Sequence, residues 1–264
     1  MMRRLIPAAA AIVLAATLAV PAAVAKKDGE RFKEATHETF DTGKSGRFTL
    51  SNVNGSVTVT GYDGSAIEVD AVKYASSQER LAETTIKSSV DDGRVTIEVE
   101  IEDDDRWDNG SSRVDFEIRV PRGTRIDDLE LVNGNLKLEG ISGRVDAASV
   151  NGDVTAERLS GDVDLSAVNG DVYLTVAGAV ESIKLHSVNG MVELVVPRDA
   201  SARVSASTVH GSIRAAGDVR AEKNFVGSSL TGVLGKGEGK IDMNTVNGDI
   251  RIFHDDEDRD KDED

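Results

Sequence analysis

The side chains of this sequence that could do chemistry are mostly carboxylates. Asp153 and Asp171 each follow an Asn-Gly pair, and Asp162 stands midway between them, close to Asp164. If equivalent residues stack, these carboxylates come within a few ångströms, where like charges repel by about 1 kcal/mol or more unless they are solvated or bridged. Oxygen ligands of this kind suit calcium. Because the Gly-Gly-x-Gly-x-Asp nonapeptide of calcium-binding β-rolls is absent, we expect these aspartates to cap turns, with a calcium-stabilised surface repeat protein as an alternative.

The segment with the most ligand-like composition is the acidic loop at 102–110, which carries the single tryptophan, Trp107. Counted as an EF-hand from Asp104, it has Asn109 where glycine is required and Asp115 where the bidentate glutamate belongs. We therefore expect a solvated hairpin loop. A tryptophan there can stack on a sugar or anchor a partner, which makes Trp107 our candidate partner contact.

The remaining candidate groups form no recognisable site. The four histidines, His37, His186, His210 and His254, show none of the short helical spacings of zinc sites. The glycine-rich stretch at 235–240 resembles a phosphate loop only superficially, because no Ser or Thr follows its lysine. Neither a Gly-x-Ser-x-Gly elbow nor a His-Glu-x-x-His helix is present. The sequence therefore predicts no catalytic residue, no metal site and no cofactor.

The enzymatic alternative is a polysaccharide lyase or hydrolase, because β-helices often present carboxylates to a glycan. Such a site needs carboxylates at a set separation, commonly with aromatic platforms for the sugar rings. After Gly123 the chain offers only Tyr173, Phe225 and Phe253 as aromatic residues. We therefore expect a protein that is not an enzyme.

Most of these residues lie in a repeat, which has to be recognised before individual strands are assigned. The tripeptide Val-Asn-Gly recurs along the chain, once with His in place of Asn, and further glycine steps at 141–143, 159–161 and 176–178 lie midway between its copies. The step is therefore about nine residues and the full unit 18. The predicted structural corners are Asn54, Gly55, Asn133, Gly134, Asn151, Gly152, Asn169, Gly170, Asn189, Gly190, His210, Gly211, Asn247 and Gly248.

Within one step the apolar residues Val163, Leu165 and Ala167 alternate with polar ones, which is typical of a half-buried strand. A hairpin meander and a solenoid of stacked coils both fit a strand plus a corner. The 132 residues from 123 to 254 hold some fourteen steps, whereas open sheets rarely exceed about ten strands. We therefore predict an all-β, single-domain parallel β-helix or β-solenoid with about 18 residues per coil, in which Asn151 and Asn169 form an amide ladder.

The N-terminal part has longer alternating runs, at 48–50, 57–60, 67–72, 95–101 and 114–120, and one short helix within 76–86, anchored by Leu81. Because solenoid ends expose strand edges that need covering, we expect this part to cap the coils. The predicted organisation is a signal peptide at 1–25, a linker at 26–44, a solenoid domain at 45–254 with its cap at 45–122 and regular Asn-Gly repeats at 123–254, and an acidic disordered tail at 255–264.

The N-terminal segment and the composition of the chain predict where in the cell the protein acts. Arg3 and Arg4, an apolar stretch and the small-x-small site Ala23-Val24-Ala25 are typical of a signal peptide. We expect export to the periplasm or to the extracellular surface, with no transmembrane segment after cleavage. The chain has no Cys and a net charge of −16, which argues against thiolate chemistry and against a nucleic-acid partner.

The stretch Val-Asn-Gly-Ser-Val-Thr-Val-Thr-Gly at 53–61, the Val-Pro-Arg-Gly at 120–123 and the serial Val-Asn-Gly-Asp-Val blocks resemble a known family. It is the bacterial β-strand-repeat family of unknown function called putative adhesins, related to the head domain of putative auto-transporter adhesins. The resemblance covers roughly 45–254 and implies a β-helical, exported protein of the cell envelope. The family has no established catalytic residue to carry over, and this sequence departs from its repeat at Met191, His210 and Ser212. We expect an adhesin or an envelope interaction or scaffold module; the sequence leaves its partner unknown, a glycan or a protein of the envelope being compatible with it.

Overall fold

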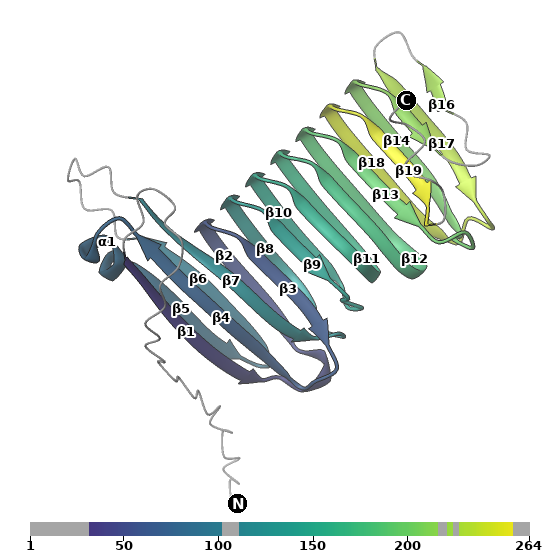
Figure 1. Ribbon diagram of the computed structural model, residues 1–264. Helices are drawn as coiled ribbons and strands as arrows, with labels where there is room; N and C mark the ends of the chain where they lie inside the picture. Colours follow the sequence, from purple (N-terminus) through teal and green to yellow (C-terminus); the bar gives the residue numbers. More distant parts are fainter. Residues whose placement is uncertain (1–31, 102–110, 216–220, 224–226, 256–264) are drawn as a thin grey trace, which may run out of the picture.

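The chain forms an elongated stack of strands (Figure 1). The computed structural model describes residues 32–101, 111–215, 221–223 and 227–255. The described residues form nineteen strands, one short α-helix and one 3-10 turn, η1 (Gly43–Ser45). The predicted signal peptide at 1–25, Trp107 and nearly all of the predicted acidic tail lie outside the described residues.

The middle of the stack is built from parallel rungs. Strand β8 (Arg125–Asn133) pairs with β10 (Val145–Asn151), which pairs in turn with the C-terminal part of β11 (Val154–Asn169). The register places Asn151 opposite both Asn133 and Asn169. Parallel pairing between equivalent strands of successive repeats excludes a hairpin meander, in which neighbouring strands run antiparallel, so this part of the chain is solenoid-like.

The strands lie on two faces joined at corners. The first face contains, in spatial order, β5 (Thr84–Asp91), β6 (Arg94–Ile101), β2 (Arg47–Asn54), β8, β10, the C-terminal halves of β11 and of β12 (Val172–Asn189), β18 (Gly239–Asn247), β14 (Ala202–His210), β17 (Ser228–Leu234) and β16 (Ala221–Lys223). The second face contains β1 (Phe32–Asp41), β4 (Ala66–Ala75), β7 (Ser112–Pro121), β3 (Val57–Tyr62), β9 (Leu136–Glu139), the N-terminal halves of β11 and β12, β13 (Val192–Val196), β19 (Ile250–His254) and β15 (Ile213–Ala215).

The core lies between these two faces. Every second side chain of a strand points inward, and the inward positions are filled by Val, Leu, Ile and Ala, as in Leu165 on the first face and Leu174 on the second, both with no exposed surface. Among the residues that the structure describes, aromatic side chains enter the core only near the N-terminal end, where Phe48 and Phe116 are its largest buried side chains. A narrow core of aliphatic residues is sufficient here because each coil is covered by its neighbours above and below.

The N-terminal end begins earlier than the sequence predicts. The expected linker at 26–44 contains β1, which pairs antiparallel with β4 over its whole length. Most of its side chains are polar and only Phe40 is buried, as suits an edge strand, and this composition hid it among linker residues. The predicted helix is confirmed as α1 (Gln78–Glu83), but Arg80 is buried there whereas the expected anchor Leu81 is only half-buried.

The C-terminal third departs from regular coiling. Asn169 and Asn189 are 20 residues apart, whereas Asn151 and Asn169 are 18 residues apart, and β17 then runs antiparallel to β14. The last coil, β18 and β19, does not add to the end of the stack: β18 lies between β12 and β14, parallel to both. The expectation of regular repeats through 254 is therefore corrected for the part after β13, where the order of coils in space is not their order in sequence.

Among the residues placed in the structure, no helix has the length and the apolar character needed to cross a membrane.

Candidate interaction surfaces

One corner of the stack carries an unbroken ladder of side-chain amides. Nδ2 of each asparagine after the first donates to Oδ1 of the asparagine before it in the stack, at distances of 2.8 or 2.9 Å. In spatial order the ladder consists of Asn54, Asn133, Asn151, Asn169, Asn189 and Asn247. His210 stands in register with Asn247 at its end, and its carbonyl accepts from N–H of Gly248 at 3.0 Å.

The predicted corner glycines follow these residues and permit very close stacking. A methyl group on Gly152 would lie 2.0 Å from the carbonyl oxygen of Gly134, and one on Gly190 would lie 2.0 Å from that of Gly170. Gly152 also has a φ of 149°, which disfavours other residues. The corner therefore requires glycine mainly because the backbones of adjacent coils touch there.

Carboxylates after the glycines continue the same corner as caps. Oδ1 of Asp153 accepts from N–H of Asp171 at 2.9 Å, and Oδ1 of Asp171 accepts from N–H of Met191 at 2.7 Å. Ser212 donates in the same way to Asp249 at 2.8 Å. These bonds confirm that Asp153 and Asp171 cap turns. At Met191 and Ser212 the repeat loses its aspartate, but the backbone N–H of each residue still donates to the aspartate of the adjacent coil.

Hydroxyl groups support the corner from inside. Ser187 and Thr245 are nearly buried, and each donates at 3.0 Å to a glycine carbonyl of the adjacent coil, Gly170 and Gly190 respectively. The hydroxyl residues that precede Val150, Val188, Val209 and Val246 therefore point inward, because each hydroxyl satisfies a glycine carbonyl that the corner leaves without a strand partner.

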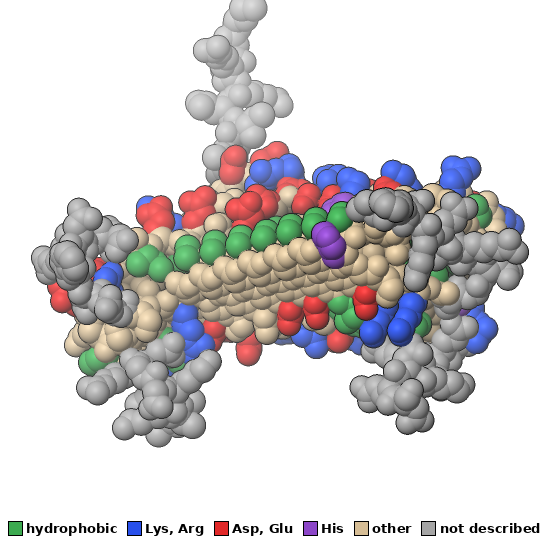
Figure 2. All heavy atoms as spheres, turned by 90° about the horizontal axis from the view of Figure 1, so that it is seen from above, with side chains coloured by type: hydrophobic (Ala, Val, Ile, Leu, Met, Phe, Trp, Pro, Cys, Tyr) green, Lys and Arg blue, Asp and Glu red, His purple; other side chains and the backbone are tan. Residues whose placement is uncertain are grey.

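The valines of the repeat consequently point outward and form a straight apolar line. We call this line the valine column. Its members are between 36% and 42% exposed: Val53, Val132, Val150, Val168, Val188, Val246 and Val209, in spatial order. Figure 2 shows it as a continuous row of hydrophobic side chains beside the uncharged band of the amide ladder. With rungs about 4.8 Å apart, the column extends for about 29 Å. Our sequence analysis predicted the corners but not this surface. Strict alternation predicts it, because the residue before each valine points inward and the valine must then point outward.

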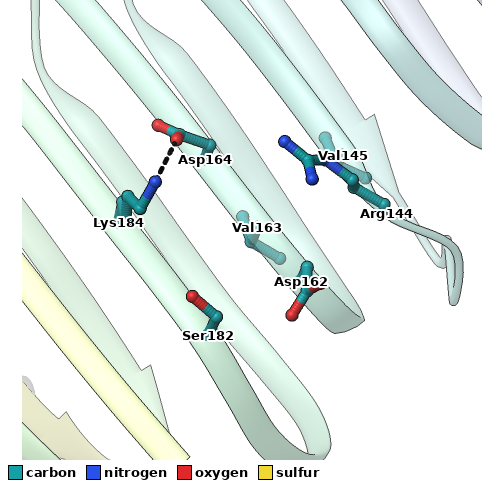
Figure 3. A pocket seen from close by; sticks show the side chains of 7 residues that line it. All are labelled: Arg144, Val145, Asp162, Val163, Asp164, Ser182 and Lys184. Atoms are coloured by element: carbon teal, nitrogen blue, oxygen red, sulfur yellow. Dashed lines mark hydrogen bonds and ion pairs between the residues drawn. The ribbon is translucent and has the colours of Figure 1, made fainter.

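A second set of outward side chains on the first face is charged. A depression of about 60 Å³ lies there. Arg144, Asp162, Asp164 and Lys184 are among the side chains that line it (Figure 3). Lys184 Nζ lies 3.2 Å from Asp164 Oδ2. Burial and the neighbouring Asp164 raise the pKa of Asp146, the next carboxyl along the row. This row is a solvated array of positive and negative side chains, in which the ionised form of Asp146 is disfavoured.

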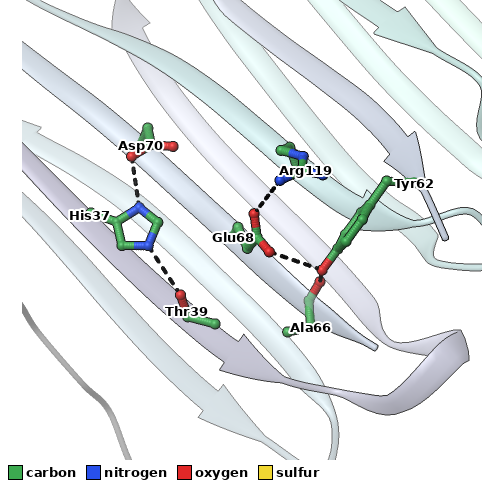
Figure 4. Close-up of polar contacts among 7 residues, drawn as sticks. All are labelled: His37, Thr39, Tyr62, Ala66, Glu68, Asp70 and Arg119. Atoms are coloured by element: carbon green, nitrogen blue, oxygen red, sulfur yellow. Dashed lines mark hydrogen bonds and ion pairs between the residues drawn. The ribbon is translucent and has the colours of Figure 1, made fainter. Parts of the chain in front are cut away.

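The second face carries two polar networks near the N-terminal end (Figure 4). Tyr62 donates to the carbonyl of Ala66 at 2.8 Å and to Glu68 at 3.2 Å, and Glu68 also accepts from Arg119 at 2.8 Å. The guanidinium of Arg119 lies 4.4 Å from the centre of the Tyr62 ring. Burial and the charge of Glu68 raise the pKa of Tyr62. These contacts fasten β3, β4 and β7 together.

In the second network His37 lies between an acid and a hydroxyl, the order found in nucleophilic triads. Nδ1 of His37 is 2.7 Å from Asp70, and Nε2 is 3.3 Å from the hydroxyl of Thr39. The side chains of His37 and Asp70 are 43% and 55% exposed on an open strand face, where water weakens the contact between them. We interpret this arrangement as a surface contact that ties β1 to β4.

The two other histidines lie in separate elements of the stack. His186 is half-buried beside the valine column and its Nδ1 lies 3.4 Å from Nδ2 of Asn244, while His254 is the last residue of β19. In the part of the chain that the structure describes, no three His, Asp or Glu side chains gather closely enough to hold a metal ion.

Comparison with known proteins agrees with the resemblance seen in the sequence. Residues 132–253 match the family Toastrack DUF4097, and no curated protein matches the chain. A putative cell adhesion protein from Clostridium sporogenes ATCC 15579 has 14% identity and a TM-score of 0.48, covering 84% of this chain and 100% of its own. A putative adhesin from Bacteroides fragilis NCTC 9343 has 12% identity and a TM-score of 0.36, covering 84% and 97%. A putative lipid binding protein from Parabacteroides distasonis ATCC 8503 has 11% identity and a TM-score of 0.33, covering 84% and 96%.

Proposed function

We propose that this protein is an exported, non-enzymatic interaction module of the cell envelope that holds a partner protein along its valine column. The observation that carries the proposal is the column itself: seven valines, each 36% to 42% exposed, in one straight line. Single exposed apolar residues are ordinary, but a contiguous apolar strip on a soluble protein marks a contact surface. A strip this regular is formed by the repeat and not by chance.

The borders of the column favour a protein partner. On one side lies the amide ladder, and on the other lies a row of outward side chains that carries one acid, Glu130, among Ser51, Ala148, Ser166, His186, Asn244 and Ser207. The strip is therefore nearly uncharged although the chain has a net charge of −16. An uncharged apolar line can be desolvated at little cost, as the centre of a protein interface requires.

The structural part of the proposal is one elongated parallel β-helix that runs through 45–254 and is extended by β1. The segment 45–122 acts as its N-terminal cap and the signal at 1–25 directs export to the periplasm or the cell surface. The turn-capping oxygens of Asp153 and Asp171 already accept backbone N–H groups, so we assign these carboxylates to stability and not to calcium.

The test uses envelope fractions of the producing organism and the mature chain from Lys26. In the double variant Val150→Asp with Val168→Asp, two charges interrupt the column, and we expect at least tenfold less protein to co-sediment with the envelopes. The matched control is Thr58→Asp with Thr155→Asp, which adds the same charge to the second face and should bind as the unmodified protein does. Protease treatment of the envelopes should abolish binding. Equal binding by the two double variants, or binding that survives protease treatment, would contradict the proposal.

A further inference from the structure

A pocket of about 420 Å³ opens on the second face, away from the valine column. It lies where β12, β13 and β19 meet the corner opposite the amide ladder. Its lining consists of Arg158, Tyr173, Thr175, Val176, Ala177, Gly178, Val195, Pro197, Phe253, His254 and Asp255. This volume lies within the range of small-ligand sites, about 300–1,000 Å³.

The outward side chains change character at this pocket. Along the same row of the second face the outward residues are polar at Thr60, Glu139 and Glu157. On the next rungs the register continues from Thr175 to Val195 and Phe253. Val195 is only 7% exposed although it occupies an outward position. The repeat therefore builds an apolar floor only where the pocket is.

A buried polar atom stands at the end of this floor. Nδ1 of His254 is among the buried side-chain atoms of the described residues that have no hydrogen-bond partner. Its backbone is fixed, because β19 pairs with β13 up to His254 and the next N–H, of Asp255, donates to the carbonyl of Val196 at 3.1 Å. Buried nitrogen atoms without a partner are rare. Because His254 also lines the pocket, a turn of its ring would bring this nitrogen within reach of a ligand hydroxyl.

The wall contributed by β11 is also unusual. Arg158 has a φ of 52°, a left-handed conformation that residues other than glycine rarely adopt. Its N–H donates to the hydroxyl of Thr175 at 2.9 Å, and its guanidinium is paired with Glu139. Strained residues of this kind concentrate at functional sites. Because its charge is already paired, the wall offers hydrogen bonds without a free cation.

We infer that this pocket binds a neutral carbohydrate, one or two sugar rings in size. The C–H face of a sugar packs on apolar and aromatic side chains such as Val195 and Phe253, while its hydroxyls bond polar groups on the rim. His254, Thr175 and Asp255 provide those groups. A phosphorylated ligand would need more positive charge than the paired Arg158 gives, and an acyl chain would leave the polar rim without partners. The inference does not depend on the valine column, which lies on the first face.

Calorimetric titration of the mature protein tests this inference with two neutral disaccharides, cellobiose and N,N′-diacetylchitobiose, and with decanoate and glucose 6-phosphate as comparison ligands. We expect at least one disaccharide to bind, with neither comparison ligand binding as tightly. Ala177→Trp places a large side chain at the exposed mouth of the pocket and should weaken binding at least tenfold. Ala179→Trp is the matched control: Ala179 is exposed two residues later and does not line the pocket, so its variant should stay within about twofold.

A third variant separates recognition from folding. His254→Ala removes the atom that has no partner in the protein, so it should weaken disaccharide binding several-fold without lowering the melting temperature. Failure of both disaccharides to bind at about 20 mM, well above ordinary weak affinities, would overturn the inference. Equal affinities for the two tryptophan variants, or tight binding of decanoate alone, would overturn it as well, whatever the result for the valine column.

Discussion

Nδ2 of Asn169 donates to Oδ1 of Asn151 at 2.9 Å, although 18 residues separate them, and Oδ1 of Asn169 accepts from Nδ2 of Asn189 at 2.8 Å. Each interior amide therefore gives one hydrogen bond and receives one, so that three successive coils are joined through a single side chain. Bonds in such a chain polarise one another. The ladder is thus a structural element in its own right, beside the backbone pairing.

Replacing Asn169 by valine tests this element. The variant loses both amide bonds and leaves Asn151 and Asn189 each with one fewer partner. At about 0.5–1.5 kcal/mol for each of the two bonds, we expect the free energy of unfolding to fall by about 1–3 kcal/mol, measured by thermal or urea denaturation. The control is Asp164→Asn, which removes an exposed pair with Lys184 that is worth between about 0 and 1 kcal/mol. Equal losses for the two variants would mean that the ladder contributes nothing beyond the strands.

The corner glycines give a second prediction, in which steric contact and backbone conformation are separated. In Gly190→Ala the new methyl group meets the carbonyl oxygen of Gly170 at 2.0 Å, whereas in Gly178→Ala it meets nothing within 4 Å but stands at a φ of 111°. Two coils must separate in the first case, so we expect a loss of about 3 kcal/mol or more. The second variant carries backbone strain of about 1–3 kcal/mol. Denaturation of both proteins measures the difference, and a Gly178 variant less stable than the Gly190 variant would contradict the close stacking at the corner.

The corner was predictable from sequence because the constant spacing from Asn133 to Asn151 and from Asn151 to Asn169, 18 residues each time, leaves few ways to stack them. The order of the last coils was not predictable, for a related reason. Asn247 bonds Asn189 across 58 residues and stands in register with His210, yet its local sequence resembles that of every other coil. Because the corner sequences are nearly identical, any coil can stack on any other. The repeat therefore predicts the fold but not the order of its coils.

The valine column was hidden by the polarity of its neighbours. In the Ser-Val-Asn-Gly at 187–190 a hydroxyl residue precedes the valine, and an apolar residue next to a polar one is usually taken as the buried member of the pair. The structure reverses this assignment because Ser187 binds the carbonyl of Gly170 at 3.0 Å. Local polarity cannot reveal a hydrogen bond whose acceptor lies in another coil. The pocket around His254 could not be predicted because its lining comes from several coils.

The carboxyl row on the first face predicts a pH effect of defined sign. Burial and Asp164 raise the pKa of Asp146, Asp128 adds to the effect, and Arg144 opposes it. A raised pKa in the folded state means that protonation favours folding, and this contribution is complete below the ordinary carboxyl pKa of about 3.9. It is lost as the pH rises through the raised value. Asp146→Asn should therefore increase the melting temperature at pH 7, and the gain should vanish below about pH 4.

Asp249 supplies the opposite case for the same experiment. The N–H of Ser212 donates to it at 2.8 Å and the hydroxyl of Ser212 at 3.0 Å, and the backbone hydrogen bond is the main reason that its pKa is lowered. Its contribution to stability is present above the ordinary pKa and is lost as the pH falls through the lowered one. Asp249→Asn should thus lower the melting temperature at pH 7, with the difference closing in acid. Melting temperatures of both variants that shift in the same direction at pH 7 would refute the assignment.

The position of the last coil predicts how the protein responds to truncation. A solenoid whose coils stack in sequence order would only become shorter if residues 239–264 were removed. Here β18 lies between β12 and β14. Strand β14 pairs with two strands, β18 on one side and the antiparallel β17 on the other. Removal should therefore detach β14 and β17 from the stack, so that trypsin cleaves after Arg203, which lies within β14 and which we expect the paired strand to protect in the full chain. Removal of 256–264 alone leaves every described strand in place and should not change the cleavage. If Arg203 stays protected without β18 and β19, then β14 is held by something other than the inserted coil, and the spatial order β12, β18, β14 is wrong.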